Sequence, residues 1–316
     1  MNTMTTRPYP FLPQLTAMQI AYKNEDGSLI ADRIFPTVKV NSAEYSYNVY
    51  PEATFFDVPK DIEVGRVSQT PAITYESEQK TASLKNYAVE FYLPRADKMM
   101  PEAFEYASNA VPLLNNSLDL SYELAVSRMI RDVNLYPATN KQVLAPADKV
   151  SNPASDPISM LEDIINGSMV KFNTIIMGKD ALLNLRRHPK VVQAVLGNAN
   201  TSGRVTEEDL LSMLRGIKTL LVGESWINNS APGPNSSPLF TQCWERDIIL
   251  AYVNPLTTTT RDFSFGIKAE WKDGRELMHF FDENKGPYGS DVIRVVHPYN
   301  PHIMAPKAAY LIKDAV

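Results

Sequence analysis

The sequence predicts an α+β fold, and three features of the 316-residue chain support this prediction. Residues 109–136 carry apolar side chains at three- and four-residue steps, the spacing of one face of a long α-helix. The chain before this helix is extended and rich in proline, whereas the chain after it alternates short helical and strand patterns. A long helix set between such regions favours a fold in which it covers a β layer.

The long helix is expected to bury one face along its whole length. Asn109 suits the position that caps its start, and Pro112 is tolerated in a first turn. Pro137 is expected to end the helix, which at 1.5 Å per residue is about 40 Å long. The expected core face consists of Val111, Leu114, Leu118, Tyr122, Ala125, Met129 and Val133.

Residues 1–50 are predicted to form an N-terminal arm, with a strand at residues 37–40. Tyr45 and Tyr47 are aromatic groups on extended chain that has no compact core of its own. Two burial sites remain open for them, the body of the same chain or a neighbouring subunit.

Residues 51–93 are predicted to be an extended hairpin loop. Its outgoing arm is residues 58–67, and its return arm, residues 86–93, alternates apolar and other side chains from Tyr87 to Leu93. The stretch between the arms is mostly polar, so the hairpin is expected to project. An isolated two-stranded hairpin is marginal in water, which favours a partner for this loop.

Residues 151–255 read as an inserted α/β domain. Asp156 followed by Pro157 predicts a helix start, and Thr206 followed by acidic residues predicts another. Strands are expected at residues 172–178, 219–223 and 247–253, so that one sheet carries helices.

Residues 256–316 return to β structure and, with residues 94–150, are predicted to form a peripheral domain around the long helix. Residues 263–271 alternate apolar and polar or small side chains, the pattern of a half-buried strand. Further strands are expected at 292–296 and 308–312. The long helix is the expected cover for the apolar face of this layer.

Composition excludes several classes of function. The formal net charge is −5 and no run of Lys or Arg occurs, so the electrostatic footprint of a nucleic-acid-binding protein is missing. A single cysteine rules out an internal disulfide, and with four scattered histidines it makes no zinc spacing. The apolar runs are too short to span a bilayer and the N-terminus lacks a signal-peptide core, so neither secretion nor membrane insertion is expected.

No catalytic, cofactor-binding or metal-binding residue is predicted, and the protein is expected not to be an enzyme. The Gly178-Lys179 pair lacks the preceding glycine of a phosphate loop, and residues 223–227 lack the last glycine of a nucleophile elbow. Cys243 is expected to be a buried structural thiol rather than a nucleophile. The proline-flanked histidines are expected in turns: His188, His297 and His302.

Five stretches occur in a recognisable order along nearly the whole chain. They are residues 26–36 (Asp-Gly-Ser-Leu-Ile-Ala-Asp-Arg-Ile-Phe-Pro), residues 179–195 with Leu-Arg-Arg-His-Pro, residues 222–229 (Val-Gly-Glu-Ser-Trp-Ile-Asn-Asn), residues 243–252 (Cys-Trp-Glu-Arg-Asp-Ile-Ile-Leu-Ala-Tyr) and residues 305–313 (Ala-Pro-Lys-Ala-Ala-Tyr-Leu-Ile-Lys). The parts of the chain also follow one another in a characteristic order: an arm, a hairpin, the long helix of residues 109–136 (the spine helix), the α/β insert and the β layer. With this order, the five stretches resemble the major capsid protein of tailed bacteriophages. This is the Hong Kong phage capsid fold, which encapsulin shells share.

The resemblance implies a structural head protein that self-assembles into an icosahedral shell around a phage genome. It implies that residues 151–255 form the axial domain around five- and six-fold axes, in pentamers and hexamers, and that the hairpin reaches a neighbouring subunit. A separate scaffolding protein, a portal, decoration proteins and non-specifically contacted DNA are the further partners implied, with no cofactor and no membrane. The implied location is the virion, after assembly in the host cytoplasm.

Two alternatives compete with the viral shell. An encapsulin-like nanocompartment would have the same arm and hairpin, but it should bind cargo through a groove on its inner surface. An α/β enzyme would account only for the region of residues 151–255.

Overall fold

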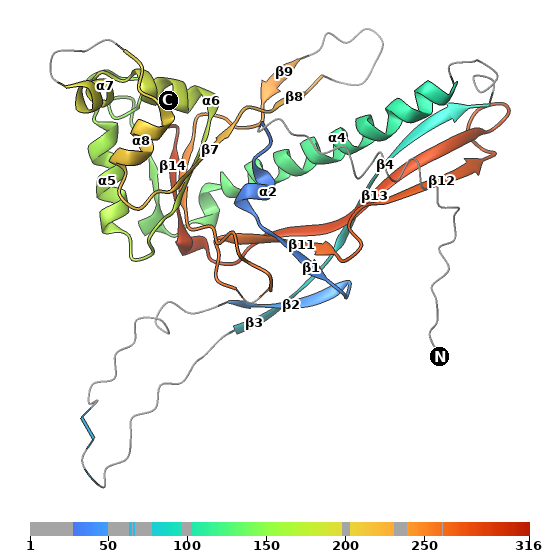
Figure 1. Ribbon diagram of the computed structural model, residues 1–316, viewed down its shortest axis with the longest axis horizontal. Helices are drawn as coiled ribbons and strands as arrows, with labels where there is room; N and C mark the ends of the chain where they lie inside the picture. Colours follow the sequence, from blue (N-terminus) through green and yellow to red (C-terminus); the bar gives the residue numbers. More distant parts are fainter. Residues whose placement is uncertain are drawn as a thin grey trace.

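The computed structural model describes residues 28–49, 63–64, 66, 78–95, 103–197, 203–230, 239–260 and 262–316, with the backbone alone for 103–109. Within these residues the molecule is elongated, and a long helix, α4, runs diagonally over one β-sheet towards a second sheet that carries the shorter helices (Figure 1). The α+β class predicted from the sequence is confirmed.

Helix α4 (Ala103–Ile130) is 28 residues long, close to the predicted length, but both predicted ends were wrong. Pro112 lies inside the helix and not in its first turn. The helix ends well before Pro137 because Asp132 adopts an extended backbone and caps a separate 3-10 helix, η2 (Val133–Leu135). The hydroxyl of Tyr136 donates to the carbonyl of Ile130 at 2.6 Å and so satisfies one of the free carbonyls at the helix end.

The predicted core face of α4 is confirmed in its first half. Val111, Leu114, Leu118 and Tyr122 are all buried, but Ala125 is exposed and Val126 and Ile130 are buried in its place. A helix with 3.6 residues per turn shifts its contact line along its length, so the buried stripe moves by one residue in the second half.

The first sheet contains β1 (Thr37–Val40), β4 (Lys85–Pro94), β11 (Gly266–Trp271), β12 (Glu276–Asp282) and β13 (Ser290–Ile303). Strand β13 is its axis: the first half pairs with β12 and β4, and the second half pairs with β11. Strand β1 runs parallel to β11, which brings the N-terminal part of the chain into the sheet.

The predicted alternation in residues 86–93 is confirmed, and the strand has a partner that was not predicted. Strand β4 pairs with β13 from residue 85 to residue 94, and Tyr87, Val89 and Phe91 pack towards α4. One of the two separate two-stranded ribbons among the described residues consists of β2 (Glu44–Val49) and β3 (Glu78–Ser83). Most of the predicted outgoing arm, residues 58–67, lies outside the described residues.

The prediction that the long helix covers the apolar face of residues 263–271 was wrong for Ile267 and Ala269. These residues pack against Val38, Val40 and Tyr45 from β1 and β2. The face with Gly266, Lys268 and Glu270 is the one towards α4, and it is also buried. Both faces are buried because Tyr45 of β2 packs with Ala269 on one side of β11, while α2 (Ala31–Ile34) and α4 cover the other side.

The second sheet has the strand order β5-β14-β10-β6-β7. The strands are β5 (Lys141–Val143), β14 (Ala309–Lys313), β10 (Ile248–Ala251), β6 (Thr174–Gly178) and β7 (Thr219–Gly223). The helices on it are α5 (Pro157–Gly167), α6 (Lys179–Arg187), α7 (Pro189–Leu196) and α8 (Glu207–Met213). The predicted caps at Asp156 and Thr206 are both present. Short elements complete the chain: η3 (Ala138–Asn140), β8 (Trp226–Asn228), β9 (Phe240–Gln242) and η4 (Pro306–Ala308).

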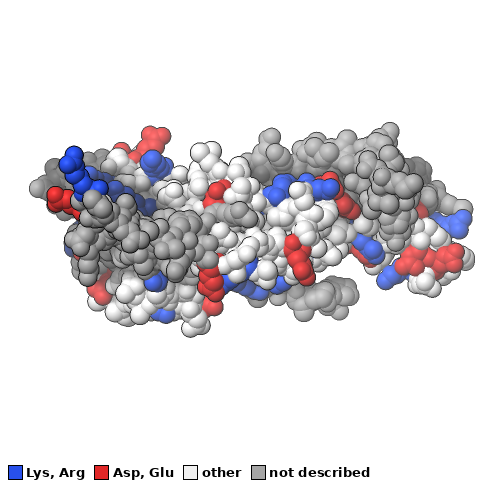
Figure 2. Space-filling view, turned by 90° about the horizontal axis from the view of Figure 1, so that it is seen from below, with Lys and Arg blue, Asp and Glu red and all other residues white. Residues whose placement is uncertain are grey.

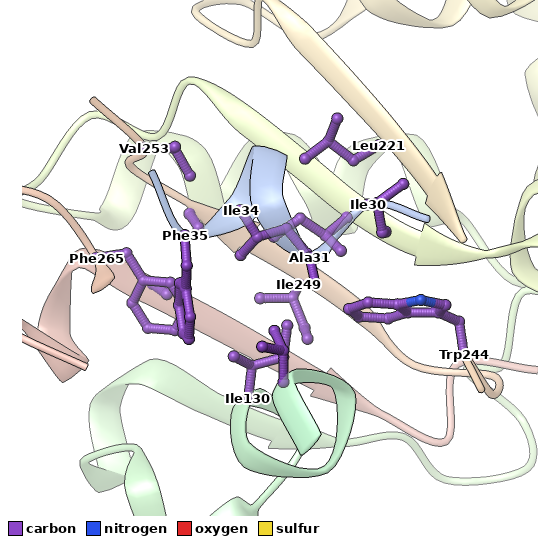
Figure 3. Packing of buried hydrophobic residues seen from close by; sticks show 14 of the residues in the cluster. Ile30, Ala31, Ile34, Phe35, Ile130, Leu221, Trp244, Ile249, Val253 and Phe265 are labelled. Carbon is purple, nitrogen blue, oxygen red and sulfur yellow. The ribbon is translucent and has the colours of Figure 1, made fainter. Parts of the chain in front are cut away.

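One hydrophobic cluster joins the two sheets. It combines α2, α4, β7, β10 and the segment before β11, and Figure 3 shows Ile34, Ile130, Ile249 and Phe265 packed in its centre. Strands β5 and β14, predicted within the peripheral domain, pair in the second sheet. The second sheet therefore contains strands from residues 151–255 and also from the ranges before and after them.

Candidate functional site

A buried three-way junction lies where the N-terminal segment, the long helix and the second sheet meet. The carboxylate of Glu123 on α4 accepts hydrogen bonds from the amides of Ile30 and Ala31, both at 2.9 Å, and from Nε1 of Trp244 at 2.6 Å. Ile30 and Ala31 provide free N–H groups at the start of α2, whose N-cap residue has no side-chain cap. Glu123 therefore caps α2 from another helix.

Two glycines make room for the tryptophan at this junction. Gly178 and Gly223 are register partners at the ends of β6 and β7. A Cβ on Gly223 would lie 2.0 Å from the Trp244 ring, and one on Gly178 would lie 2.2 Å from the carbonyl oxygen of Glu245. Segment 244–245 therefore packs directly on the second sheet.

Neighbouring hydrogen bonds join the same three parts. Ser127, one turn after Glu123, donates to the carbonyl of Cys243 at 2.7 Å. The amide of Glu224 donates to the carbonyl of Ser28 at 3.4 Å, and the amide of Cys243 donates to the carbonyl of Ser225 at 2.9 Å. Burial raises the pKa of Glu123, although its three N–H donors act in the opposite direction.

A second polar cluster lies between α4 and the first sheet. Glu270 is bonded to Nε2 of His297 at 2.6 Å and to Nζ of Lys39 at 2.7 Å. Lys268 pairs with Asp32 at 2.9 Å, and its Nζ lies 4.4 Å from the centre of the Tyr122 ring. These contacts connect β1, α2, β11, β13 and α4.

A third cluster fixes the end of α4 to the second sheet. Asp247 accepts from Nε of Arg131 at 2.7 Å, from Nζ of Lys313 at 2.7 Å and from the amide of Asp314 at 2.9 Å. Burial opposes ionisation of Asp247, but Lys313 and Arg131 outweigh it and hold its pKa below the ordinary value. Glu245 is a more exposed partner of the same arginine.

The β2–β3 ribbon lies beneath the first sheet, on the side away from α4 (Figure 1). Its base is fixed to β13, because the hydroxyl of Tyr45 lies 3.1 Å from Nδ1 of His302 and the ring of Tyr47 lies 4.5 Å from that imidazole. Of the two burial sites left open for Tyr45, the body of its own chain is therefore the one observed. All residues of β3 but Ala82 are exposed.

The β8–β9 ribbon projects from the other side of the molecule (Figure 1). Trp226 and Phe240 are 53% and 60% exposed, whereas Ile227 packs against the core. On the face drawn in Figure 2, positive and negative side chains of the described residues are interspersed among uncharged ones. That face has no broad patch of one sign among the residues described.

Of the residues considered for chemistry, Gly178, residues 223–227 and Cys243 lie side by side at the ends of β6 and β7, whereas the three histidines have their hydrogen-bond partners elsewhere. Cys243 is buried as expected, and burial raises its pKa, which disfavours a reactive thiolate. His188 lies between α6 and α7 as predicted, but His297 and His302 are in β13 rather than in turns, because the strand continues through both prolines next to them. Among the residues described, no group of three or more His, Cys, Asp or Glu could hold a metal ion, and no helix is long and apolar enough to cross a membrane.

Comparison with known proteins identifies the family. No family model matches the chain. It is 30% identical over 314 residues to the major capsid protein of Pseudomonas phage JBD67, covering 99% of both chains. The chain belongs to the phage major capsid protein family. A second relative is the major capsid protein of Burkholderia phage BcepMu, at 26% identity over 219 residues, 66% of this chain and 67% of the relative.

Solved structures agree with the capsid fold. A phage-related protein from Bordetella bronchiseptica superposes with a TM-score of 0.73 at 21% identity, over 98% of each chain. An encapsulin complex from Synechococcus elongatus has a TM-score of 0.51 at 11% identity, over 98% of this chain and 91% of that one. The likeness to encapsulin thus extends to the fold alone, whereas the sequence relatives are phage proteins. The chain is a structural capsid protein whose copies associate into a capsid lattice.

Sequence reasoning missed Glu123, Glu270 and Asp247, the buried carboxylates that hold the parts of this capsid protein together. A signal was present for Glu123, because it precedes Val126 and Ile130 by three and seven residues and so lies on their buried stripe.

Proposed function

We propose that this capsid protein forms the hexamers and pentamers of a closed icosahedral shell around phage DNA, with the β2–β3 ribbon and the loop it carries reaching a neighbouring subunit. The ribbon is the observation that carries the proposal. Its two strands pair with each other and leave the first sheet, and two-stranded ribbons are marginal without further packing. A neighbouring copy would supply that packing.

In this proposal residues 94–150 and 256–316 form the peripheral domain and residues 151–255 form the axial domain around the symmetry axes. The arm of residues 1–50 and the loop of residues 51–93 are the segments that contact other subunits. The two sheets joined by α4 support this division, except that β5 and β14, from the peripheral ranges, pair within the axial sheet.

Other partners follow from the shell. DNA would be contacted non-specifically, a separate scaffolding protein, a portal and decoration proteins would bind the lattice, and assembly would take place in the host cytoplasm. The role needs no catalytic residue and no cofactor. Family membership supports a structural role, since the two named relatives are major capsid proteins.

Charge reversal on the ribbon tests the intersubunit contact. Lys80, 47% exposed, lies 3.7 Å from Glu78. Because an exposed ion pair contributes about 0 to 1 kcal/mol, K80E should leave the melting temperature of the subunit unchanged and still reduce assembly, measured by sedimentation. Lys190 on α7 has a similar exposure and one carboxylate partner, Asp156, so K190E controls for the change in net charge. A loss of subunit stability in K80E alone would instead place the ribbon in the core of its own chain.

A further inference from the structure

The carboxylate of Glu123 serves two separate parts of the fold with shared atoms. Oε1 accepts both the Ile30 amide and the indole Nε1 of Trp244, and Oε2 accepts the Ala31 amide. The arm segment and the second sheet therefore bind the same side chain on the spine helix, and Figure 3 shows Ile30, Ala31 and Trp244 close together.

The arm segment depends on this carboxylate because its own sequence offers no substitute. Ile30 is the N-cap residue of α2 and has no polar side chain with which to bind the free amides. Upstream of Ile30, the bond from the Glu224 amide to the Ser28 carbonyl is long, at 3.4 Å. The start of α2 thus relies on Glu123 to accept hydrogen bonds from its first two amides.

The position of the Trp244 indole, in contrast, depends on the position of the second sheet. Trp244 is seated on Gly223, and the adjoining carbonyls pack on Gly178, so a shift of β6 and β7 relative to α4 displaces Nε1. Losing that donor leaves Oε1 with only the Ile30 amide and frees the carboxylate to change rotamer. Buried polar groups that share an acceptor respond as a network rather than as independent pairs.

We propose that Glu123 couples the attachment of the N-terminal arm to the placement of the second sheet on the spine helix, so that displacing either one loosens the other. This coupling is a property of one subunit, and it goes beyond self-assembly. Any neighbouring molecule that moves the second sheet would thereby change how firmly the chain before residue 30 is held. By linkage, a molecule that binds the arm would also bias the position of the sheet.

The geometry also predicts the effect of Glu123→Gln. A glutamine has one acceptor oxygen and one NH₂ group, but three donors converge on this site. If the glutamine oxygen takes the place of Oε1, the glutamine NH₂ group faces the amide of Ala31, and two donors meet. If the oxygen takes the place of Oε2, the NH₂ group faces both the Ile30 amide and the Trp244 indole. Either orientation exposes the start of α2 to exchange.

A double-mutant cycle tests the coupling on the purified full-length chain. Hydrogen exchange of the Ile30 and Ala31 amides is measured in the wild type, W244F, E123Q and the double variant. We expect W244F, which removes Nε1 together with two ring carbons, to speed this exchange about tenfold, the size of a lost hydrogen bond to a charged group. In the E123Q background the same substitution should change exchange less than about twofold, because the shared acceptor is already compromised.

Two outcomes overturn the proposal. Unchanged exchange in W244F shows that the indole does not support the arm, and an equal increase in both backgrounds shows that Trp244 acts through packing and not through Glu123. E123D, which keeps the charge but is one methylene shorter, provides the second background if E123Q does not fold. Exchange within one subunit does not require shells, so this result is separate from the fate of the assembly proposal.

Discussion

His297 on β13 donates a hydrogen bond from Nε2 to Glu270 on β11 over 2.6 Å, beneath the spine helix and almost out of reach of solvent. Burial lowers the pKa of His297, so the imidazole is the neutral donor. Burial opposes ionisation of Glu270 as well, but His297, Lys268 and Lys39 outweigh it and lower its pKa to about 2. The pair makes the stability of the first sheet depend on pH.

We expect the capsid subunit to lose stability on acidification in two overlapping windows. A glutamate with a folded pKa of about 2 contributes stability that is fully present above its ordinary value of about 4.3 and is lost as the pH falls towards 2. The lowered pKa of His297 affects stability in the same direction, and its contribution falls below about pH 6.5, the ordinary histidine value.

Urea unfolding at pH 7, 5, 4 and 3 measures this loss of stability. E270Q should be less stable at pH 7 and should lack the step below about pH 4.3; parallel pH profiles for both proteins would refute the assignment.

The two carboxylates that bind Arg131 should differ sharply in their contribution to stability. The Asp247 side chain is 3% exposed and also binds Lys313, whereas that of Glu245 is 65% exposed. D247N should cost about 3 to 5 kcal/mol of unfolding free energy, since it removes the carboxylate that Lys313 binds and leaves Arg131 with only the exposed Glu245. E245Q, the matched control on the same arginine, should cost less than about 1 kcal/mol. Similar losses in the two variants would contradict this account of the junction.

Gly266 should tolerate no side chain, because a Cβ there would lie 2.4 Å from the Phe35 ring. Overpacking of this kind costs about 1 to 3 kcal/mol, so G266A should lower the melting temperature. Gly167, at the last position of α5, has open space where a Cβ would be added, with no described atom beyond its chain neighbours and its own helix backbone within 4 Å, and G167A should be neutral or slightly stabilising. Adding F35L should recover part of the loss in G266A. No recovery would show that the damage lies elsewhere than at the ring.

The parts of the fold that depend on local patterns could be predicted from the sequence. The caps at Asp156 and Thr206 were predictable because a side chain near in sequence makes each of them. The C-terminal end of α4 was not, since it depends on Asp132 capping η2 and on the bond between Arg131 and the distant Asp247. The alternation of β4 was visible, but its partner, β13, lies about two hundred residues away in the sequence.

The polar junctions could not be derived from the sequence, for a related reason. Lys268 and Glu270 alternate with apolar residues and so have the pattern of a solvated face. They are buried because α2, α4 and β1 converge on β11, and each then finds an opposite charge from another part of the chain. Such partners lie far apart in sequence, and no local period encodes them.

Electron cryomicroscopy of particles assembled from the purified protein tests the central claim most directly. The account predicts closed icosahedral shells of 35.4 kDa subunits in which the β2–β3 ribbon of each copy rests on a neighbouring copy. A chain that remains monomeric at high concentration under all assembly conditions, or shells in which the ribbon packs only on its own subunit, would contradict it.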